Sequence, residues 1–189
     1  EDVKEETIIS EYLNLVVTSS EQLKEYVNKL LTYYTSDNLI VSKTRFPLAD
    51  LISEINQIVN ANNEAEIVTD FDENLEIITD RTALSQILIN IISNGIKYNT
   101  TDKPIIKITN NIVNFKSNIS ISDNGIGIDT QNFETIFQNN KTLSKKDRYG
   151  NYGTGLGLAI VMNLTQKIDF DIKVSSEIGK GSTFTLMEK

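Results

Sequence analysis

A long amphipathic segment opens the chain. Over residues 7–35, apolar side chains recur at alternating spacings of four and three residues, the a/d pattern of a helix that packs on another helix. The positions of this seam are Ile9, Leu13, Val16, Ser20, Leu23, Val27, Leu30 and Tyr34. The pattern predicts a helix about 40 Å long, too long for a small domain to cover. We interpret it as a dimerisation or docking helix; the alternative is a helix folded against its own domain.

The rest of the pattern predicts alternating helices and strands. Polar residues 36–38 end the first helix, 39–45 form a connector or short edge strand, and Pro47 opens a second amphipathic helix. Further helices are predicted at 80–98 (with Asp80 as N-cap), 133–137 and 153–167, and strands at 66–71, 75–79, 105–112, 118–123, 170–176 and 182–187, with a hairpin turn near 114–117. This order predicts an α+β fold, a two-layer α/β sandwich whose mixed sheet of about five strands carries helices on one face.

Composition excludes several classes of chemistry. The 189 residues include no cysteine and no histidine, which rules out disulfide scaffolds, thiol nucleophiles, Ser-His-Asp triads and histidine-ligated metals within the chain. The net charge of −8 argues against a nucleic-acid partner. Apolar runs are far shorter than the roughly 18 residues that a membrane span needs. The chain starts at Glu1 without a signal peptide, so we expect a piece of a longer protein.

Glycine is distributed unevenly. None of the nine glycines precedes Gly95, and six lie between Gly125 and Gly157. Loops that bring bare backbone close to a ligand have this composition, so we expect the site in this segment.

The predicted helix 80–98 is apolar around most of its circumference. The remaining stripe carries Asn90, Asn94 and Lys97 at positions i, i+4 and i+7. Asparagine is a weak helix former, and buried amides must be hydrogen-bonded. The stripe therefore indicates contacts to a ligand or to metal-bound water, although an ordinary solvent-facing stripe is the alternative.

A carboxylate is predicted to enter the core at the end of a strand. Alternation places Ile119, Ile121 and Asp123 on one face of that strand, the face toward the helices. An unpaired buried carboxylate costs several kcal/mol, and an exocyclic amino group on a bound base would supply a donor. Gly125 and Gly127 would let the ligand approach the backbone; the alternative is a plain Asp-Asn-Gly turn.

Three alternate glycines lead into the helix predicted at 153–167. Gly153, Gly155 and Gly157 would present backbone N–H groups and the positive end of a helix dipole to an anion; the alternative is a flexible linker. The basic stretch 141–148 before them resembles a mobile lid that supplies positive charge.

Together and in this order, these segments resemble the ATP-binding catalytic domain of sensor histidine kinases, within the wider GHKL ATPase group. The similar segments are 89–98 (N box), 123–127 (G1 box), 133–137 (a reduced F box), 153–159 (G2 box) and 179–184 (the closing strand signature). The resemblance implies a Bergerat-type fold, with 1–38 as part of a dimerisation and phosphotransfer helix, 39–45 as connector and 46–189 as catalytic domain.

The resemblance also implies a role for each matching residue. Asp123 would accept from the adenine amino group, and Asn94 would coordinate Mg²⁺ at the phosphates, with Asn90 beside it. Lys97 would lie near the phosphates and Tyr98 near the base, under a lid over 138–152. The further residues implied to line the nucleotide are Gly125, Gly127, Ile128, Arg148, Gly153, Thr154, Gly155, Leu156, Gly157 and Leu158.

The implied function is binding of Mg-ATP and donation of its γ-phosphoryl group to a histidine outside this chain. An amide at Asn90 cannot accept a proton, so hydrolysis should be slow. The implied partners are a histidine-bearing dimerisation helix, a second copy of the parent protein and a response regulator, in the cytoplasm. The alternatives are an ATP-driven conformational clamp and a degenerate nucleotide-binding signalling module.

Overall fold

The computed structural model describes residues 2–36, 39–113, 116–143 and 145–189. The helices are α1 (Asp2–Ser36), α2 (Leu48–Val59), α3 (Arg81–Lys97) and α4 (Gly157–Lys167), with a 3₁₀ turn at Thr130–Asn132. The strands are β1 (Lys43–Pro47), β2 (Glu66–Asp70), β3 (Glu76–Asp80), β4 (Ile105–Val113), β5 (Lys116–Asp123), β6 (Phe170–Glu177) and β7 (Gly181–Glu188).

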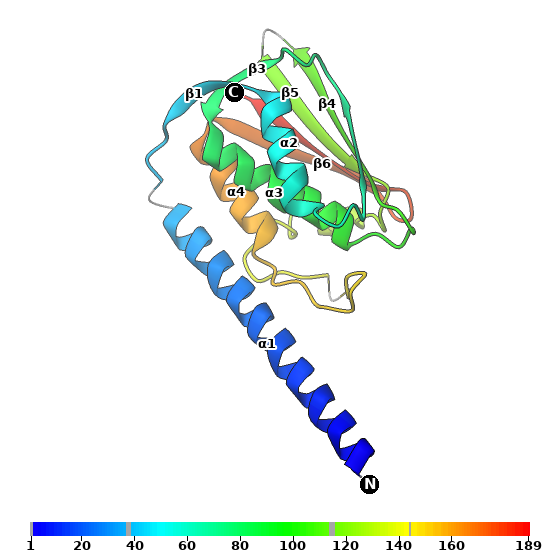
Figure 1. The fold of residues 1–189 in the computed structure, drawn as a ribbon. Coiled ribbons are helices and arrows are strands. Elements are labelled where there is room, and N and C mark those ends of the chain that lie inside the picture. Colours follow the sequence, from blue (N-terminus) through cyan, green and yellow to red (C-terminus); the bar gives the residue numbers. More distant parts are fainter. Residues whose placement is uncertain (1, 37–38, 114–115, 144) are drawn as a thin grey trace.

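Five of these strands form one mixed sheet, which confirms the predicted fold class. Their spatial order is β2-β4-β5-β7-β6; β2 and β4 run parallel, and the other neighbours are antiparallel. Figure 1 shows α2, α3 and α4 on one face of this sheet. The remaining strands, β1 and β3, form a separate antiparallel pair.

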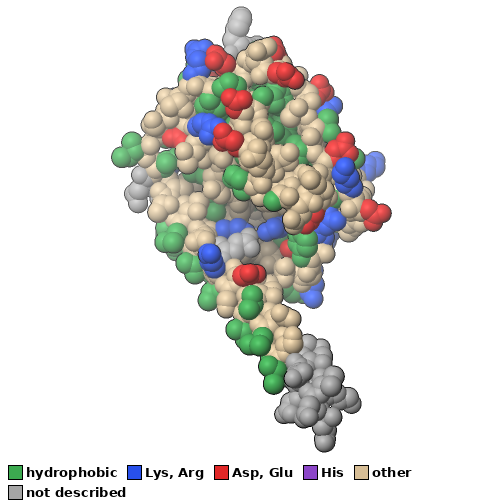
Figure 2. Space-filling model, viewed as in Figure 1, with side chains coloured by type: hydrophobic (Ala, Val, Ile, Leu, Met, Phe, Trp, Pro, Cys, Tyr) green, Lys and Arg blue, Asp and Glu red, His purple; other side chains and the backbone are tan. Residues whose placement is uncertain are grey.

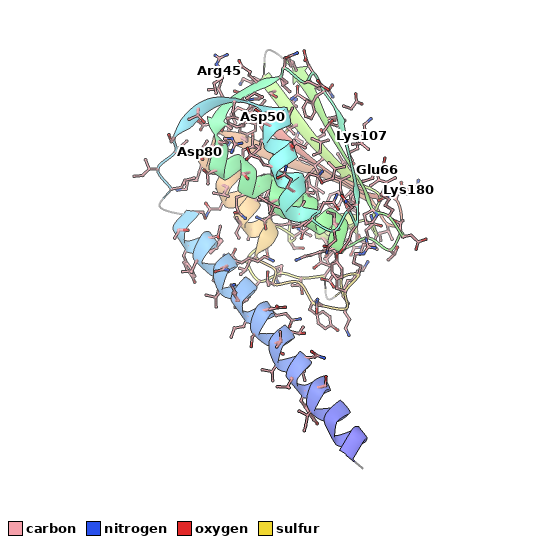
Figure 3. All side chains as sticks on the ribbon, in the orientation of Figure 1. Arg45, Asp50, Glu66, Asp80, Lys107 and Lys180 are labelled. Carbon is pink, nitrogen blue, oxygen red and sulfur yellow. The ribbon has the colours of Figure 1, made fainter. Side chains whose placement is uncertain are left out.

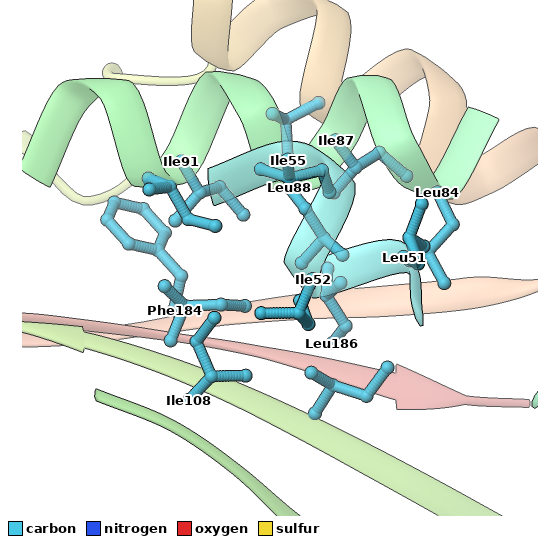
Figure 4. Close-up of a cluster of buried hydrophobic side chains, with 14 of the residues drawn as sticks. Leu51, Ile52, Ile55, Leu84, Ile87, Leu88, Ile91, Ile108, Phe184 and Leu186 are labelled. Carbon is cyan, nitrogen blue, oxygen red and sulfur yellow. The ribbon is translucent and has the colours of Figure 1, made fainter. Parts of the chain in front are cut away.

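The core lies between the helices and the inner face of the sheet. Alternation turns Ile108, Ile121 and Leu186 inward, where they pack beneath α2 and α3, as Figure 4 shows for Ile108 and Leu186. The outer face is polar: the Ser120 hydroxyl bonds that of Thr185 at 3.0 Å. This contrast between an apolar inner face and a polar outer face fixes the register of the strands. It also places the end of β5 beneath α3.

Charged pairs lie at the rim of the domain rather than inside it. The ammonium of Lys107 lies 2.8 Å from Asp70, and the guanidinium of Arg45 lies 3.0 Å from Glu76. Figure 3 shows Arg45 and Lys107 at the edge of the body, away from α1. Such exposed pairs contribute little stability, so the apolar core holds the fold.

Helix α1 extends well beyond the body (Figure 1). Its seam residues Leu13 and Leu23 are 61% and 63% exposed. Tyr26, Leu30 and Tyr33 near its end pack against the core. The helix therefore lies on its own domain over its last turns only, while most of the predicted seam stays uncovered. No helix in the described ranges is long and apolar enough to span a membrane.

Two predicted helices differ from the structure. The helix expected at 133–137 is absent there; the chain forms a three-residue 3₁₀ helix at Thr130–Asn132, after the Asp129 side chain accepts from Gln131 N, and continues as turns. The helix expected from Gly153 begins only at Gly157, because Gly155 adopts a left-handed φ of 70°. The predicted helix end at 37–38 and part of the predicted hairpin turn, 114–115, lie outside the described residues.

The N-cap of α3 gives a stability prediction. The buried Asp80 carboxylate accepts from the backbone N–H of Ala83 at 2.9 Å and of Ser42 at 2.8 Å. Asp80→Ala leaves both donors without their acceptor, so we expect the free energy of unfolding to fall by about 1–3 kcal/mol in urea denaturation. The exposed-pair control Asp70→Ala should cost less than about 1 kcal/mol. Equal losses for the two variants would contradict this role of Asp80.

Candidate functional site

One large cavity lies where the sequence predicts the site. Its volume is about 960 Å³, and it is enclosed by the C-terminal end of α3, the end of β5, the segment 138–152 and the start of α4. In Figure 2 the body is hollowed where α1 meets it, and Lys and Arg side chains lie around this hollow. The predicted site residues that line the cavity are Asn94, Lys97, Tyr98, Asp123, Gly127, Ile128, Gly153, Thr154, Gly155, Gly157 and Leu158.

Asp123 ends β5 on the inward face, in register with the buried Ile119 and Ile121. Its Oδ1 accepts from the backbone N–H of Gly125 at 2.8 Å and of Ser182 at 3.2 Å. Burial raises the pKa of this carboxyl above its ordinary value, and the two backbone hydrogen bonds oppose that rise. Its Oδ2 accepts from no described residue, so a cavity-lining carboxylate retains one open acceptor.

The α3 stripe divides between the cavity and the core. Asn94, Lys97 and Tyr98 line the cavity, and burial followed by the nearby Asp147 charge raises the pKa of Tyr98. Asn90 is buried and does not line it; its Nδ2 donates to the carbonyl of Gln86, one turn back on α3, at 2.8 Å. Of the predicted stripe, Asn94 and Lys97 therefore line the cavity, and Asn90 lies next to the lining residue Gly157 without lining the cavity itself.

The glycines after β5 serve the packing of the chain on itself. A Cβ at Gly125 would lie 2.6 Å from the carbonyl oxygen of Tyr98, and one at Gly127 would lie 2.1 Å from that of Glu177. We expected these positions to be bare for the sake of a ligand. The structure shows that they let the loop fit between the end of α3 and the β6–β7 turn, and Gly127 also lines the cavity.

Gly157 allows α4 to begin against α3. A Cβ there would lie 3.0 Å from Oδ1 of Asn90 and 3.8 Å from Nδ2 of Asn94. The first turn of α4, whose N–H groups have no partners within the helix, thus packs directly against the polar stripe of α3, where Asn94 and Gly157 line the cavity. This arrangement suits an anion at the helix N-terminus.

The described parts of the predicted lid, 138–143 and 145–152, border the cavity. The start of the lid is tied to the glycine turn, because the N–H of Asn140 donates to the carbonyl of Gly155 at 3.1 Å. Near its other end, the N–H of Arg148 donates to the carbonyl of Lys97 at 2.9 Å. These contacts position a lid between the glycine turn and the end of α3.

Side chains of the lid add two further contacts. The Tyr149 hydroxyl donates to the Glu64 carboxylate in the loop after α2; burial and this bond raise the pKa of Tyr149 to about 12, and the same bond lowers the pKa of Glu64. The ammonium of Lys146 lies 5.5 Å from the ring centre of Tyr152. Tyr149 is therefore a neutral donor at physiological pH, and it holds the lid to the body.

The cavity is positively charged in an acidic protein. Among the residues that the structure describes, five lysines and two acids, Asp123 and Asp147, line it, whereas the chain carries −8. The lysines are Lys29, Lys97, Lys141, Lys145 and Lys146. A local excess of positive charge against the average field indicates an anionic ligand.

Three further predicted residues lie outside the cavity lining. Gly125 and Leu156 are buried behind it. The Arg148 guanidinium turns to the carbonyl of Asp102, 3.4 Å from Nη2, and its buried Nη1 has no hydrogen-bond partner in the described part of the chain. The backbone of Arg148 bonds the end of α3, and its side chain is not among the residues that line the cavity.

Sequence reasoning missed several contributors. Ser182 was recognised only as part of the closing strand, yet its N–H holds Asp123. Gln22 and Lys29 of α1 also line the cavity. The signal in the sequence is a second periodicity, Gln22-Tyr26-Lys29-Tyr33. Each of these residues directly precedes one of the last four seam positions, and together they could have indicated this face of the helix.

Comparison with known proteins gives the same family as the resemblance of the sequence motifs. The family model for histidine kinase-, DNA gyrase B- and HSP90-like ATPases matches residues 79–188. The autoinducer 2 sensor kinase/phosphatase LuxQ of Vibrio parahaemolyticus is 32% identical over 89% of this chain and 21% of its own length. Among solved structures, full-length ShkA in complex with AMPPNP superposes with a TM-score of 0.77 at 22% identity, over 94% of this chain and 38% of ShkA. The catalytic domain of the histidine kinase ThkA gives 0.65 at 26% identity, over 78% and 97%.

The chain therefore belongs to the histidine kinase-, DNA gyrase B- and HSP90-like ATPase family. It spans about a tenth to two-fifths of the length of the curated relatives that it matches.

The loop after β5 yields a second prediction. Gly127 (φ 70°) and Gly179 (φ 80°) share a left-handed conformation, but a Cβ at Gly179 meets nothing within 4 Å. Gly179→Ala should cost only the conformational strain, about 1–2 kcal/mol of unfolding free energy. Gly127→Ala adds a collision with the Glu177 carbonyl and should cost more than about 3 kcal/mol. Equal losses in denaturant titrations would show that the close approach at Gly127 does not matter.

Proposed function

We propose that this chain is the ATP-binding catalytic part of a sensor histidine kinase, which binds Mg-ATP and donates its γ-phosphoryl group to a histidine that this chain does not contain. The observation that carries the proposal is the half-satisfied carboxylate of Asp123 at the cavity. Its open Oδ2 matches the exocyclic amino group of adenine, a donor, and mismatches guanine, which has a carbonyl oxygen there.

The cavity has the parts that such a nucleotide needs. The apolar lining residues Ile126, Ile128 and Leu158 offer flat contact for a purine near Asp123. Gly153–Gly157 and the start of α4 offer N–H donors for phosphate oxygens, and the lysines of the cavity offer charge.

The donor set also fits Mg²⁺ held chiefly by phosphates. The described residues contain no group of three or more His, Cys, Asp or Glu able to hold a metal. Asn94 at the cavity supplies one amide oxygen, in keeping with the preference of Mg²⁺ for a few protein ligands together with phosphates and water. When bound, the ion would neutralise charge that develops on the phosphates.

In this proposal the chain positions the nucleotide and excludes water. The imidazole nitrogen of the acceptor histidine attacks the γ-phosphorus, the bond from that phosphorus to the β–γ bridging oxygen breaks, and ADP leaves. No carboxylate of the α3 stripe is present to activate water, because Asn90 bears an amide already bonded to Gln86. We therefore expect phosphoryl transfer to prevail over hydrolysis.

The wider organisation is part of the same proposal. Residues 1–38 would belong to a dimerisation and phosphotransfer helix, 39–45 to a connector and 46–189 to the catalytic domain. The histidine-bearing helix, a second copy and a response regulator in the cytoplasm would be the partners. The names of the relatives, among them hybrid signal transduction histidine kinase B of Dictyostelium discoideum, support this assignment.

Asp123→Asn tests base recognition. Because Oδ1 is held by two N–H groups, the new NH₂ must take the place of Oδ2 and face the adenine amino group, donor against donor. We expect ATP affinity to fall about 10- to 100-fold in isothermal titration, with GTP binding as well as or better than ATP.

The fold provides the control for this variant. A raised native pKa means that ionisation of Asp123 lowers stability, progressively as pH rises from the unfolded-state pKa to the native one. At pH 7 Asp123→Asn removes that cost, so its free energy of unfolding should be no lower than that of the wild type. Unchanged ATP affinity in this stable variant would remove Asp123 from the site.

The reaction is tested by supplying the acceptor. With labelled ATP and a histidine-bearing dimerisation helix added in trans, the product should be an acid-labile, base-stable phosphohistidine on the added helix. An acid-stable phosphoserine would indicate a serine kinase. Steady ATP turnover by the chain alone would favour an ATPase clamp.

A further inference from the structure

Helix α1 forms part of the wall of the cavity. Gln22 and Lys29 line it, although both lie on the helix that the seam pattern assigns to contacts with another helix. They belong to the face Gln22-Tyr26-Lys29-Tyr33, with spacings of four, three and four residues. Tyr26 and Tyr33 of this face pack against the core, so the face is docked on the domain, while most of the adjacent seam, apart from Leu30, stays exposed.

Two hydrogen bonds fix the position of Lys29 along the lid. Gln22 Nε2 donates to Oδ1 of Asn151 at 2.8 Å, and Asn139 Nδ2 donates to the hydroxyl of Tyr33. At 1.5 Å per residue, Lys29 lies about 10 Å from the first anchor and about 6 Å from the second along the helix axis. The two anchored asparagines lie at opposite ends of the lid, so Lys29 stands beside its span.

The nearer anchor lies next to the glycine turn. Asn139 is followed by Asn140, whose N–H donates to the carbonyl of Gly155. The other anchor, Asn151, lies two residues before Gly153, so both anchors adjoin the glycine turn. Lys29 lies between the anchors and lines the same cavity as Gly153–Gly157 and the start of α4. The glycine turn marks the end that we assign to phosphates, opposite the adenine contact at Asp123.

Charge supports the same placement. Lys29 shares the cavity with Lys97, Lys141, Lys145 and Lys146, and like charges in one concave space repel each other. A polyphosphate would turn this repulsion into attraction. Lys29 belongs to α1, which lies outside the catalytic layers. Its attraction to a polyphosphate would therefore also hold α1 in place.

We infer that Lys29 is a phosphate-binding residue of the nucleotide site, delivered by α1, and that α1 docking and triphosphate binding stabilise each other. The inference rests on the proposed ATP binding at this cavity. By linkage, any change that displaces α1 from the lid weakens the binding of the triphosphate. Bound triphosphate stabilises the docked position of α1 by the same free energy.

The experiment compares two ligands and three variants of this chain by isothermal titration. Lys29→Gln should weaken Mg-ATP about three- to tenfold and leave adenosine, which has no phosphate, unchanged. Lys29→Arg keeps the charge and should stay within about twofold of the wild type for both ligands. Lys24→Gln removes the same charge from an exposed position of α1 outside the cavity lining and should change neither affinity.

The outcomes separate the two claims. Glutamine and lysine have similar helix propensity, so circular dichroism should show α1 intact in each variant. Equal ATP affinities for Lys29→Gln and Lys24→Gln, or a parallel loss of adenosine in Lys29→Gln, would overturn the role of Lys29. Failure of the wild type to bind either ligand would instead overturn the proposed function itself.

Discussion

The cavity is organised around one carboxylate whose two oxygens have different surroundings. Oδ1 of Asp123 is held by the N–H groups of Gly125 and Ser182, which come from segments 57 residues apart in sequence. Because both donors are backbone groups, the orientation of Oδ2 is fixed by the fold rather than by a flexible side chain. Burial makes the charged form costly, and a ligand that donates to Oδ2 recovers part of that cost.

The surrounding structure is built to keep this carboxylate in place. Gly95 of α3 lies against it: a Cβ at Gly95 would be 3.0 Å from Cβ of Asp123 and 2.7 Å from a methyl group of Ile106. Gly125 and Gly127 let the following loop lie against the carbonyls of Tyr98 and Glu177. The end of the cavity that we propose for the base is therefore preorganised. The end that we propose for the phosphates is bounded by the lid, which is held through backbone hydrogen bonds, and by α1, which contacts the lid through side chains.

The sequence predicts the layers well because their signals are local. The Asp80 cap, the apolar circumference of α3 and the alternation along β5 each report burial directly, and the inward placement of Asp123 follows from the same alternation. What it could not predict depends on distant contacts. The partnership of Asp123 with Ser182, the turn of Asn90 back to Gln86 and the docking of α1 through the Tyr26 and Tyr33 face arise only when separated segments meet.

The glycine-rich segments illustrate the same limit. Their composition marks the segments that line the cavity, but it does not tell a backbone kept bare for a ligand from one kept bare for its own neighbours. The late start of α4 at Gly157 has a similar origin, because the left-handed Gly155 places the turn against the start of the lid.

The most direct test is a crystal structure of this chain with Mg²⁺ and a non-hydrolysable ATP analogue. The account predicts the adenine amino nitrogen within hydrogen-bond distance of Oδ2 of Asp123, while Oδ1 keeps its two backbone donors and the phosphates lie toward Gly153–Gly157. A base bound elsewhere, or an Oδ2 that contacts only water or protein in the complex, would contradict it.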